Sequence, residues 1–140
     1  MQYTQRSALE HMRAEALAGR LGAINGGGGC LYVLGEKHCA IGCILPADVV
    51  EQCAEFGSMN NMSSGELMDT IEGLEIPFNR EQASVLQEVH DDLFSGVFRE
   101  HFTPEEAIRR FVEKMDSLLS GSVTHLSSPC YLTDAYFDLN

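Results

Sequence analysis

Residues 30–48 read CLYVLGEKHCAIGCILPAD, and this stretch decides the fold class because it interrupts a chain of otherwise helical patterning. Two short apolar runs, at residues 30–34 and 38–41, flank the segment 35–37, which reads Gly-Glu-Lys. Apolar runs on either side of a short turn-forming segment predict an antiparallel hairpin. An isolated hairpin is only marginally stable in water. We therefore expect it to pack on helices or to gain a third strand from residues 1–4 or from the C-terminal tail.

Helical spacing of apolar residues dominates the rest of the sequence. We expect five helices, at residues 5–21, 46–57, 63–74, 79–94 and 103–120. The last is the best marked, because Thr103 can cap it, Pro104 takes the favoured first position, and Glu106 has capping-box spacing. In the first helix, the expected inward stripe is Leu9, Met12, Ala16, Leu17 and Leu21. The predicted fold is therefore α+β, mostly helical with one short antiparallel hairpin.

The size and composition of the chain predict one globular domain. It has 140 residues, of which 44% are hydrophobic and 21% charged, close to the values of ordinary globular proteins. We expect residues 1–121 to form a compact α+β domain. Residues 122–140 mix turn formers with aromatic residues, and we expect a C-terminal arm that is docked or partly irregular.

Compartment signals in the sequence favour the cytoplasm. No apolar run approaches the roughly 18 residues of a membrane span, and residues 1–6 lack the basic start and apolar core of a signal peptide. The five cysteines are odd in number and do not have the spacing of a disulfide framework. Reduced thiols in a cytosol fit this pattern best.

The net charge of −12 is unevenly distributed along the chain. No Lys or Arg occurs between His38 and Asn79, and the acidic residues of that stretch are Asp48, Glu51, Glu55, Glu66, Asp69, Glu72 and Glu75. An acidic surface repels phosphate backbones and anionic lipids, so we expect neither direct nucleic-acid binding nor membrane binding. These seven residues, named here the acidic face, would suit a partner with a basic surface. The alternative is a solvated face that serves only solubility.

The hairpin region also concentrates residues that can carry chemistry, namely Cys30, His38, Cys39 and Cys43. Thiolates and imidazole are zinc ligands, but His38 and Cys39 are adjacent and would point to opposite faces of a strand. A cysteine nucleophile at Cys39 or Cys43, activated by His38 or His90, is a second option. The third option is that the cysteines fill the core, since cysteine is among the most buried residue types. We expect no bound metal and no cofactor.

Three separated elements resemble a family of small uncharacterised proteins found in bacteriophages and prophage-bearing bacteria. The elements are a C-x-Y strand beginning at Cys30, the segment CAIGCILPAD at residues 39–48, and the helical motif LQEVHD at residues 86–91. In the family the second element continues from Pro-Asp into a tyrosine, which is absent here, and the likeness does not extend beyond Ser95. The resemblance implies a phage origin and a location in the cytoplasm of a bacterial host cell. It also implies a spatial cluster of Cys30, Tyr32, Cys39, Gly42, His90 and Asp91. All of these except Gly42 are candidate ligand-binding residues. The alternative, which we favour, is a structural core in which the cysteines fill space and His90 and Asp91 form a buried hydrogen-bonded pair or a helix end.

Our sequence-based hypothesis is a small acidic binding protein that inhibits a host protein by direct binding, as a phage accessory or anti-defence factor. A ligand-binding protein or a small hydrolase built on the Cys/His/Asp cluster is one alternative. A zinc-stabilised structural domain is another. An exposed hairpin edge could pair two copies, so a homodimer stays open.

Overall fold

The computed structural model describes residues 3–22, 33–34, 37–45, 76–128 and 133–139. Three α-helices lie in these ranges: α1 (Gln5–Leu17), α4 (Arg80–Phe98) and α5 (Pro104–Ser120). They are accompanied by two antiparallel hairpins and one turn of 3-10 helix, η1 (Gly42–Ile44). The fold is therefore α+β, as predicted. The expected helices at 46–57 and 63–74 lie outside the described residues, so three α-helices stand where five were expected over the whole chain.

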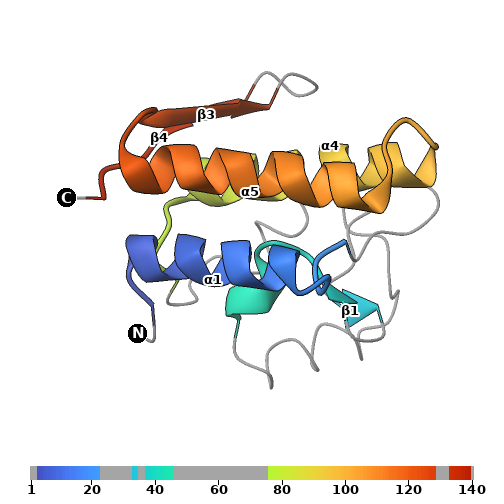
Figure 1. Cartoon of the computed structure of the whole chain (residues 1–140). Helices are drawn as coiled ribbons and strands as arrows, with labels where there is room; N and C mark the ends of the chain where they lie inside the picture. Colours follow the sequence, from blue (N-terminus) through green and yellow to red (C-terminus); the bar gives the residue numbers. More distant parts are fainter. Residues whose placement is uncertain (1–2, 23–32, 35–36, 46–75, 129–132, 140) are drawn as a thin grey trace.

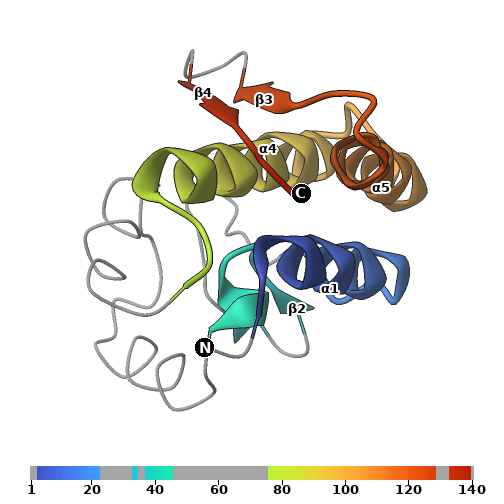
Figure 2. The same cartoon turned by 90° about the vertical axis from the view of Figure 1, so that its left-hand side faces the viewer.

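The elements stack in three layers. The antiparallel pair α4 and α5 forms the middle layer, and the hairpin of β3 (His125–Ser128) and β4 (Thr133–Tyr136) lies on its outer side (Figure 1). Helix α1 and the hairpin of β1 (Val33–Leu34) and β2 (Lys37–His38) lie on the opposite side (Figure 2). Helix α1 packs on α5, whereas both β3 and β4 pack on α4.

Capping residues explain where the helices begin. Thr4 and Asn79 each form a capping box, with Ser7 and Gln82 respectively. Thr103 accepts a hydrogen bond from the Glu106 backbone N–H at 3.1 Å, and Pro104 follows it as expected. The Glu106 carboxylate bonds to Arg110 at 3.2 Å. The caps at Thr4, Asn79 and Thr103 satisfy backbone donors that a helix start would otherwise leave open, whereas the Glu106 carboxylate pairs with Arg110 and does not close the capping box expected from its spacing.

Helix α4 is enclosed on nearly all sides. Every residue from 85 to 91 is buried, because the helix lies between the β3–β4 hairpin and the layer that contains α1 (Figure 2). The core around it includes the fully buried side chains Phe111, Leu9, Met12, Ile41, Leu86 and Met115. A helix buried all round must also bury its polar residues, and those must find hydrogen-bond partners.

The first half of the chain differs from expectation in several details. Helix α1 ends at Leu17, four residues before the predicted end, because Gly19 adopts a left-handed φ of 76°. Leu17 is consequently 57% exposed, although it was expected in the core. Beyond the turn, Leu21 forms a parallel bridge to His38, so the extra pairing of the β1–β2 hairpin that the described ranges contain comes from the residue after α1 and not from the chain start or the tail. The second strand of that hairpin is also shorter than predicted, since residues 39–45 turn into η1.

Two further corrections concern the second half. Helix α4 continues to Phe98, past the predicted end at residue 94. Its Gly96 packs tightly under the Phe102 ring, since a Cβ there would lie 2.3 Å from a ring carbon. The expected C-terminal arm contains a second hairpin, in which His125 is opposite Tyr136 and Ser127 is opposite Asp134.

Candidate functional site

A network of buried polar groups on α4 joins three segments of the chain. Gln87, His90 and Asp91 lie at spacings of three and four residues, so they share one helical face. Gln87 and His90 are 0% exposed and Asp91 is 7% exposed. The Gln87 side-chain amide donates to Asp91 Oδ1 at 2.8 Å, and its Oε1 accepts from the Ile41 backbone N–H at 3.1 Å. The network therefore fastens the turn after β2 to the middle of α4.

The hydrogen bonds of His90 define its tautomer. The backbone N–H of Gly22 points at Nε2 from 3.0 Å, and a backbone N–H can only donate. Nε2 must therefore accept, and the ring proton lies on Nδ1, which donates to Asp91 Oδ1 at 2.9 Å. Both ring nitrogens are used within the chain. His90 is thus a neutral connector between α4 and the loop after α1, and neither nitrogen is free to act as a base.

The side chain of His90 lies inside the core and not at the surface of α4. The ring is fully buried, with Phe94 at 4.8 Å and Phe111 at 6.4 Å between ring centroids. Periodicity alone could not show this, because the side of α4 opposite its apolar stripe is covered by segments distant in sequence. The pairing of His90 with Asp91 is observed, whereas Cys30 and Tyr32 lie outside the described residues.

The two described cysteines sit in environments that suppress thiol chemistry. Cys39 is fully buried, and its Sγ accepts from the Gly42 backbone N–H at 3.2 Å. Cys43 donates its S–H to the Ala40 carbonyl oxygen at 3.0 Å. Burial raises the pKa of the Cys43 thiol well above its usual range, and the neighbouring Cys39 and Glu15 add to the rise. Reactive cysteines need a lowered pKa and access to solvent, so neither described thiol is prepared for nucleophilic attack.

A polar cluster links α1 to β2 and η1, and the sequence analysis missed it. His11 Nε2 lies 3.2 Å from the Cys43 carbonyl oxygen and 3.5 Å from Glu15 Oε1. The Arg20 side chain also bonds to Glu15. That bond, with charge interactions from His11 and His38, lowers the pKa of the Glu15 carboxyl against the opposing effect of burial. The four-residue spacing of His11 and Glu15, which places both side chains on one face of a helix, was the sequence signal that could have predicted this contact.

Among the residues that the structure describes, no group of three or more His, Cys, Asp and Glu side chains could hold a metal ion. The proposed zinc set included Cys30, which lies outside those residues. Within the described ranges, His38 and Cys39 therefore belong to no ligand set.

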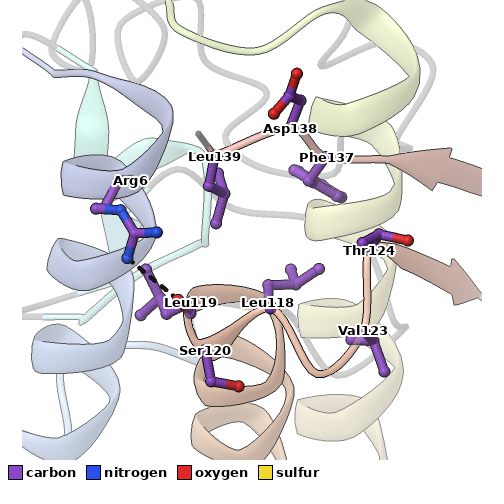
Figure 3. Close-up of a pocket in the computed structure, with 10 residues that line it drawn as sticks. Arg6, Leu118, Leu119, Ser120, Val123, Thr124, Phe137, Asp138 and Leu139 are labelled. Carbon is purple, nitrogen blue, oxygen red and sulfur yellow. Dashed lines mark hydrogen bonds between the residues drawn. The ribbon is translucent and has the colours of Figure 1, made fainter.

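A small pocket of about 260 Å³ lies where the start of α1, the end of α5 and the residues after β4 meet (Figure 3). Its apolar lining consists of Leu118, Leu119, Val123, Phe137 and Leu139. Arg6 stands at one side and donates to the Leu119 carbonyl oxygen at 3.2 Å, and Asp138 lies at the other side (Figure 3). The volume is slightly below the roughly 300–1,000 Å³ of typical small-molecule sites. None of the site residues expected from the sequence lines this pocket.

All seven residues of the acidic face lie outside the described residues, so their role stays a prediction. All nine Lys and Arg residues, by contrast, lie within the described ranges. Four of the arginines pair there with carboxylates on their own surface: Arg13, Arg20, Arg109 and Arg110. Much of the positive charge is therefore already balanced locally.

Comparisons with known proteins add no assignment. No protein-family model, curated protein or solved structure matches the chain. The resemblance to phage proteins therefore stays a prediction that depends on the three sequence elements alone. No helix in the described ranges is long and apolar enough to cross a membrane.

Proposed function

We propose that this chain is a small acidic binding protein that acts by docking onto the basic surface of another protein. The charge distribution carries the proposal. The acidic face contributes seven negative charges from residues 46–75, a segment with no Lys or Arg. Since four of the nine basic residues are paired within the described body, an external cationic surface is the natural complement.

The chemistry of the described cluster supports binding over catalysis. A hydrolase built on Cys39 and His90 would need an accessible thiol and a ring nitrogen free to take its proton. Cys39 is fully buried, and both nitrogens of His90 are held by Gly22 and Asp91. The cluster thus favours a structural role for these residues, with function on the surface.

The biological setting is the further part of the proposal. If the chain has the phage origin implied by the resemblance, its partner is a host protein, and the binding would inhibit that protein as an accessory or anti-defence measure. A basic nucleic-acid-binding groove is the kind of surface that an acidic protein of this size can cover.

The test is affinity purification of the tagged protein from a bacterial lysate at low and high salt, with mass spectrometry of the bound fraction. The triple variant E66K/D69K/E72K reverses three charges of the acidic face. The matched control E10K/E100K/E113K makes the same change in net charge at three exposed residues of the described body. We expect a near-stoichiometric partner that binds about ten-fold or more weakly to the first variant and is retained by the control.

Two outcomes would contradict the proposal. Equal weakening by both triple variants would show that only net charge matters and that no particular face is used. Capture that is unaffected by salt and by either variant would show that electrostatic complementarity does not drive the binding.

A further inference from the structure

The register of the β3–β4 hairpin shows which backbone groups point toward its two outer edges. The Phe137 N–H donates to the Thr124 carbonyl oxygen at 2.8 Å, so these two residues form a hydrogen-bonded pair. In an antiparallel ladder, hydrogen-bonded and non-hydrogen-bonded pairs alternate. The pair of His125 with Tyr136 is therefore non-hydrogen-bonded, and so is the pair that Ser127 forms two residues further on. The backbone N–H and C=O groups of these residues point away from the opposite strand.

The two outer edges differ in what covers them. On the β4 side, the outward carbonyl oxygen of Tyr136 accepts from the Gln82 side chain at 2.7 Å, so a side chain of α4 already occupies that edge. On the β3 side, the outward N–H and C=O groups of His125 and Ser127 have no hydrogen-bond partner among the described residues. Both residues are exposed, and the hairpin is an outer layer of the molecule (Figure 1). We name these outward groups of His125 and Ser127 the β3 edge.

The β3 edge lacks the usual protection against pairing with another chain. Natural edge strands carry charged side chains, prolines or bulges that prevent such pairing. The four residues of β3 include no proline and pair with β4 in unbroken register. Residues 117–133 contain no Asp, Glu, Lys or Arg, although the whole chain has 21 acidic and 9 basic residues. The sequence around β3 is therefore without the charges that keep strand edges apart.

In the β1–β2 hairpin, by contrast, the outer edge of β2 is already used. The His38 N–H donates to the Arg20 carbonyl oxygen at 2.7 Å, and Leu21 forms its bridge to the same residue. The homodimer that the sequence left open at that hairpin therefore has a better candidate in β3.

We propose that the β3 edge pairs with the β3 edge of a second copy of the chain, antiparallel across a two-fold axis, so that the two hairpins form one continuous sheet. A two-fold interface needs a surface that is complementary to itself. The β3 edge meets this need when His125 is opposite Ser127 of the second copy, because the two residues then exchange both of their backbone hydrogen bonds. The axis passes beside Leu126, and the same pair forms again on its other side.

The outward side chains also fit in this register. Ser127 Oγ donates to Asp134 Oδ1 at 3.1 Å, so its lone pairs stay free to accept a hydrogen bond. His125 of the second copy lies opposite that hydroxyl and can donate an imidazole N–H to it. A register with His125 opposite itself would put Ser127 opposite Val123. Val123 cannot pair there, because its N–H already donates to the Ser117 carbonyl oxygen at 3.2 Å.

The charge of the chain gives the dimer a salt dependence of known sign. Each copy carries a net charge of −12, so long-range repulsion opposes the association of two copies. Salt screens this repulsion, and the dimer should therefore become tighter as the salt concentration rises. Binding of a basic partner by the acidic face should become weaker under the same change, so the two interactions can be told apart.

Two measurements on the full-length protein test the proposal. Sedimentation equilibrium over an about hundred-fold range of protein concentration, at low and high salt, gives the dimer dissociation constant. Amide hydrogen exchange followed by NMR locates the interface. We expect protection of the His125 and Ser127 amides to rise with protein concentration. The amides of Leu126 and Ser128 point toward β4, so we expect them to be protected at every concentration.

The sharpest variant is S127P, which removes the N–H that Ser127 donates to the second copy. That N–H does not point toward β4, and proline is tolerated at such edge positions, so the hairpin should keep its own bonds. The matched control S127A keeps the backbone N–H. We expect S127P to raise the dimer dissociation constant about ten-fold or more, and S127A to raise it less than about three-fold.

A second pair of variants covers the case in which S127P lowers the thermal stability of the monomer. S127K places on the β3 edge the side chain that most often guards natural edge strands. S122K makes the same change in charge at an exposed serine before the strand. We expect S127K to prevent the dimer and S122K to retain it.

Three outcomes would overturn the proposal. The first is a protein that stays monomeric at every concentration and at both salt concentrations. The second is a dimer that S127P and S127K form as tightly as the wild-type protein, or that leaves the His125 and Ser127 amides unprotected. The third is protection of these two amides only when another protein is added, because the β3 edge would then bind a different chain and not a second copy.

Discussion

Replacing Gln87 by methionine should test the buried network at its centre. Methionine matches glutamine in length and approximate volume, so the packing of α4 is kept while the hydrogen bonds are removed. The change leaves the buried Ile41 backbone N–H without its acceptor and removes one donor from Asp91. An unsatisfied buried donor costs about 1–3 kcal/mol, and a hydrogen bond to a charged group contributes about 1.5–3 kcal/mol.

We expect Q87M to lower the free energy of unfolding by about 3 kcal/mol. This value allows for the fact that methionine, being apolar, is more favourably buried in the core than glutamine. That is a large share of the roughly 5–15 kcal/mol by which a typical domain is stable. With a urea m-value of about 1.5 kcal/mol/M, the unfolding midpoint should fall by about 2 M. Circular dichroism at the helical minimum follows the transition, and amide hydrogen exchange should show lost protection at Ile41.

The matched control is E10M, which introduces the same side chain at an exposed position of α1 and should change the stability by less than about 0.5 kcal/mol. If the free energy of unfolding of Q87M lies within about 0.5 kcal/mol of the wild-type value and the m-value is unchanged, the network does not stabilise the fold as argued. An altered m-value would mean that the variant changes the folded or unfolded state as a whole.

Two pH-dependent predictions follow from the shifted groups. Because burial raises the pKa of Cys43 above its usual 9.0, its contribution to stability is present below pH 9 and lost as the pH rises above it, where the unfolded thiol ionises first. Alkylation followed by mass spectrometry should show Cys43 protected in the native protein and reactive in denaturant; equal rates in both states would contradict this. Because the Arg20 bond lowers the pKa of Glu15 from 4.5, its contribution is present above pH 4.5 and lost as the pH falls through the lowered pKa. The difference in unfolding free energy between wild-type and E15Q protein should therefore shrink below pH 4.5, and a constant difference down to acid unfolding would refute the assignment.

Local signals located the starts of the three described α-helices correctly. Thr103 followed by Pro104 gave the start of α5, and Asn79 gave the start of α4, because a cap is a contact between residues three apart. The end of α5 was also readable, since Gly121 adopts the left-handed φ of 80° that favours glycine. The end of α1 could not be predicted from the sequence. Leu17 and Leu21 continue the helical spacing of apolar residues, but the helix ends at Leu17 and the chain changes direction at Gly19.

Only part of the candidate site could be predicted from the sequence. The pairing of His90 with Asp91 is local, and the two residues were placed together from their motif. The fixed tautomer of His90 depends on Gly22, 68 residues away in sequence, and the role of Gln87 depends on Ile41, 46 residues away. No spacing rule relates such positions, so the sequence could not show that the cluster is closed to chemistry.

The sequence by itself determined the α+β class, the starts of α4 and α5, and the uneven charge, because these follow from caps, apolar periodicity and composition. Only the tertiary structure decided that α4 is enclosed, that His90 is a buried connector, and that the C-terminal residues form a hairpin with an open edge at β3. The physical reason is that burial depends on which distant segments cover a face. In a four-residue strand such as β4, the alternation of apolar and polar residues is too short to be recognised in the sequence. The strand becomes stable only because α4 provides a surface on which it packs.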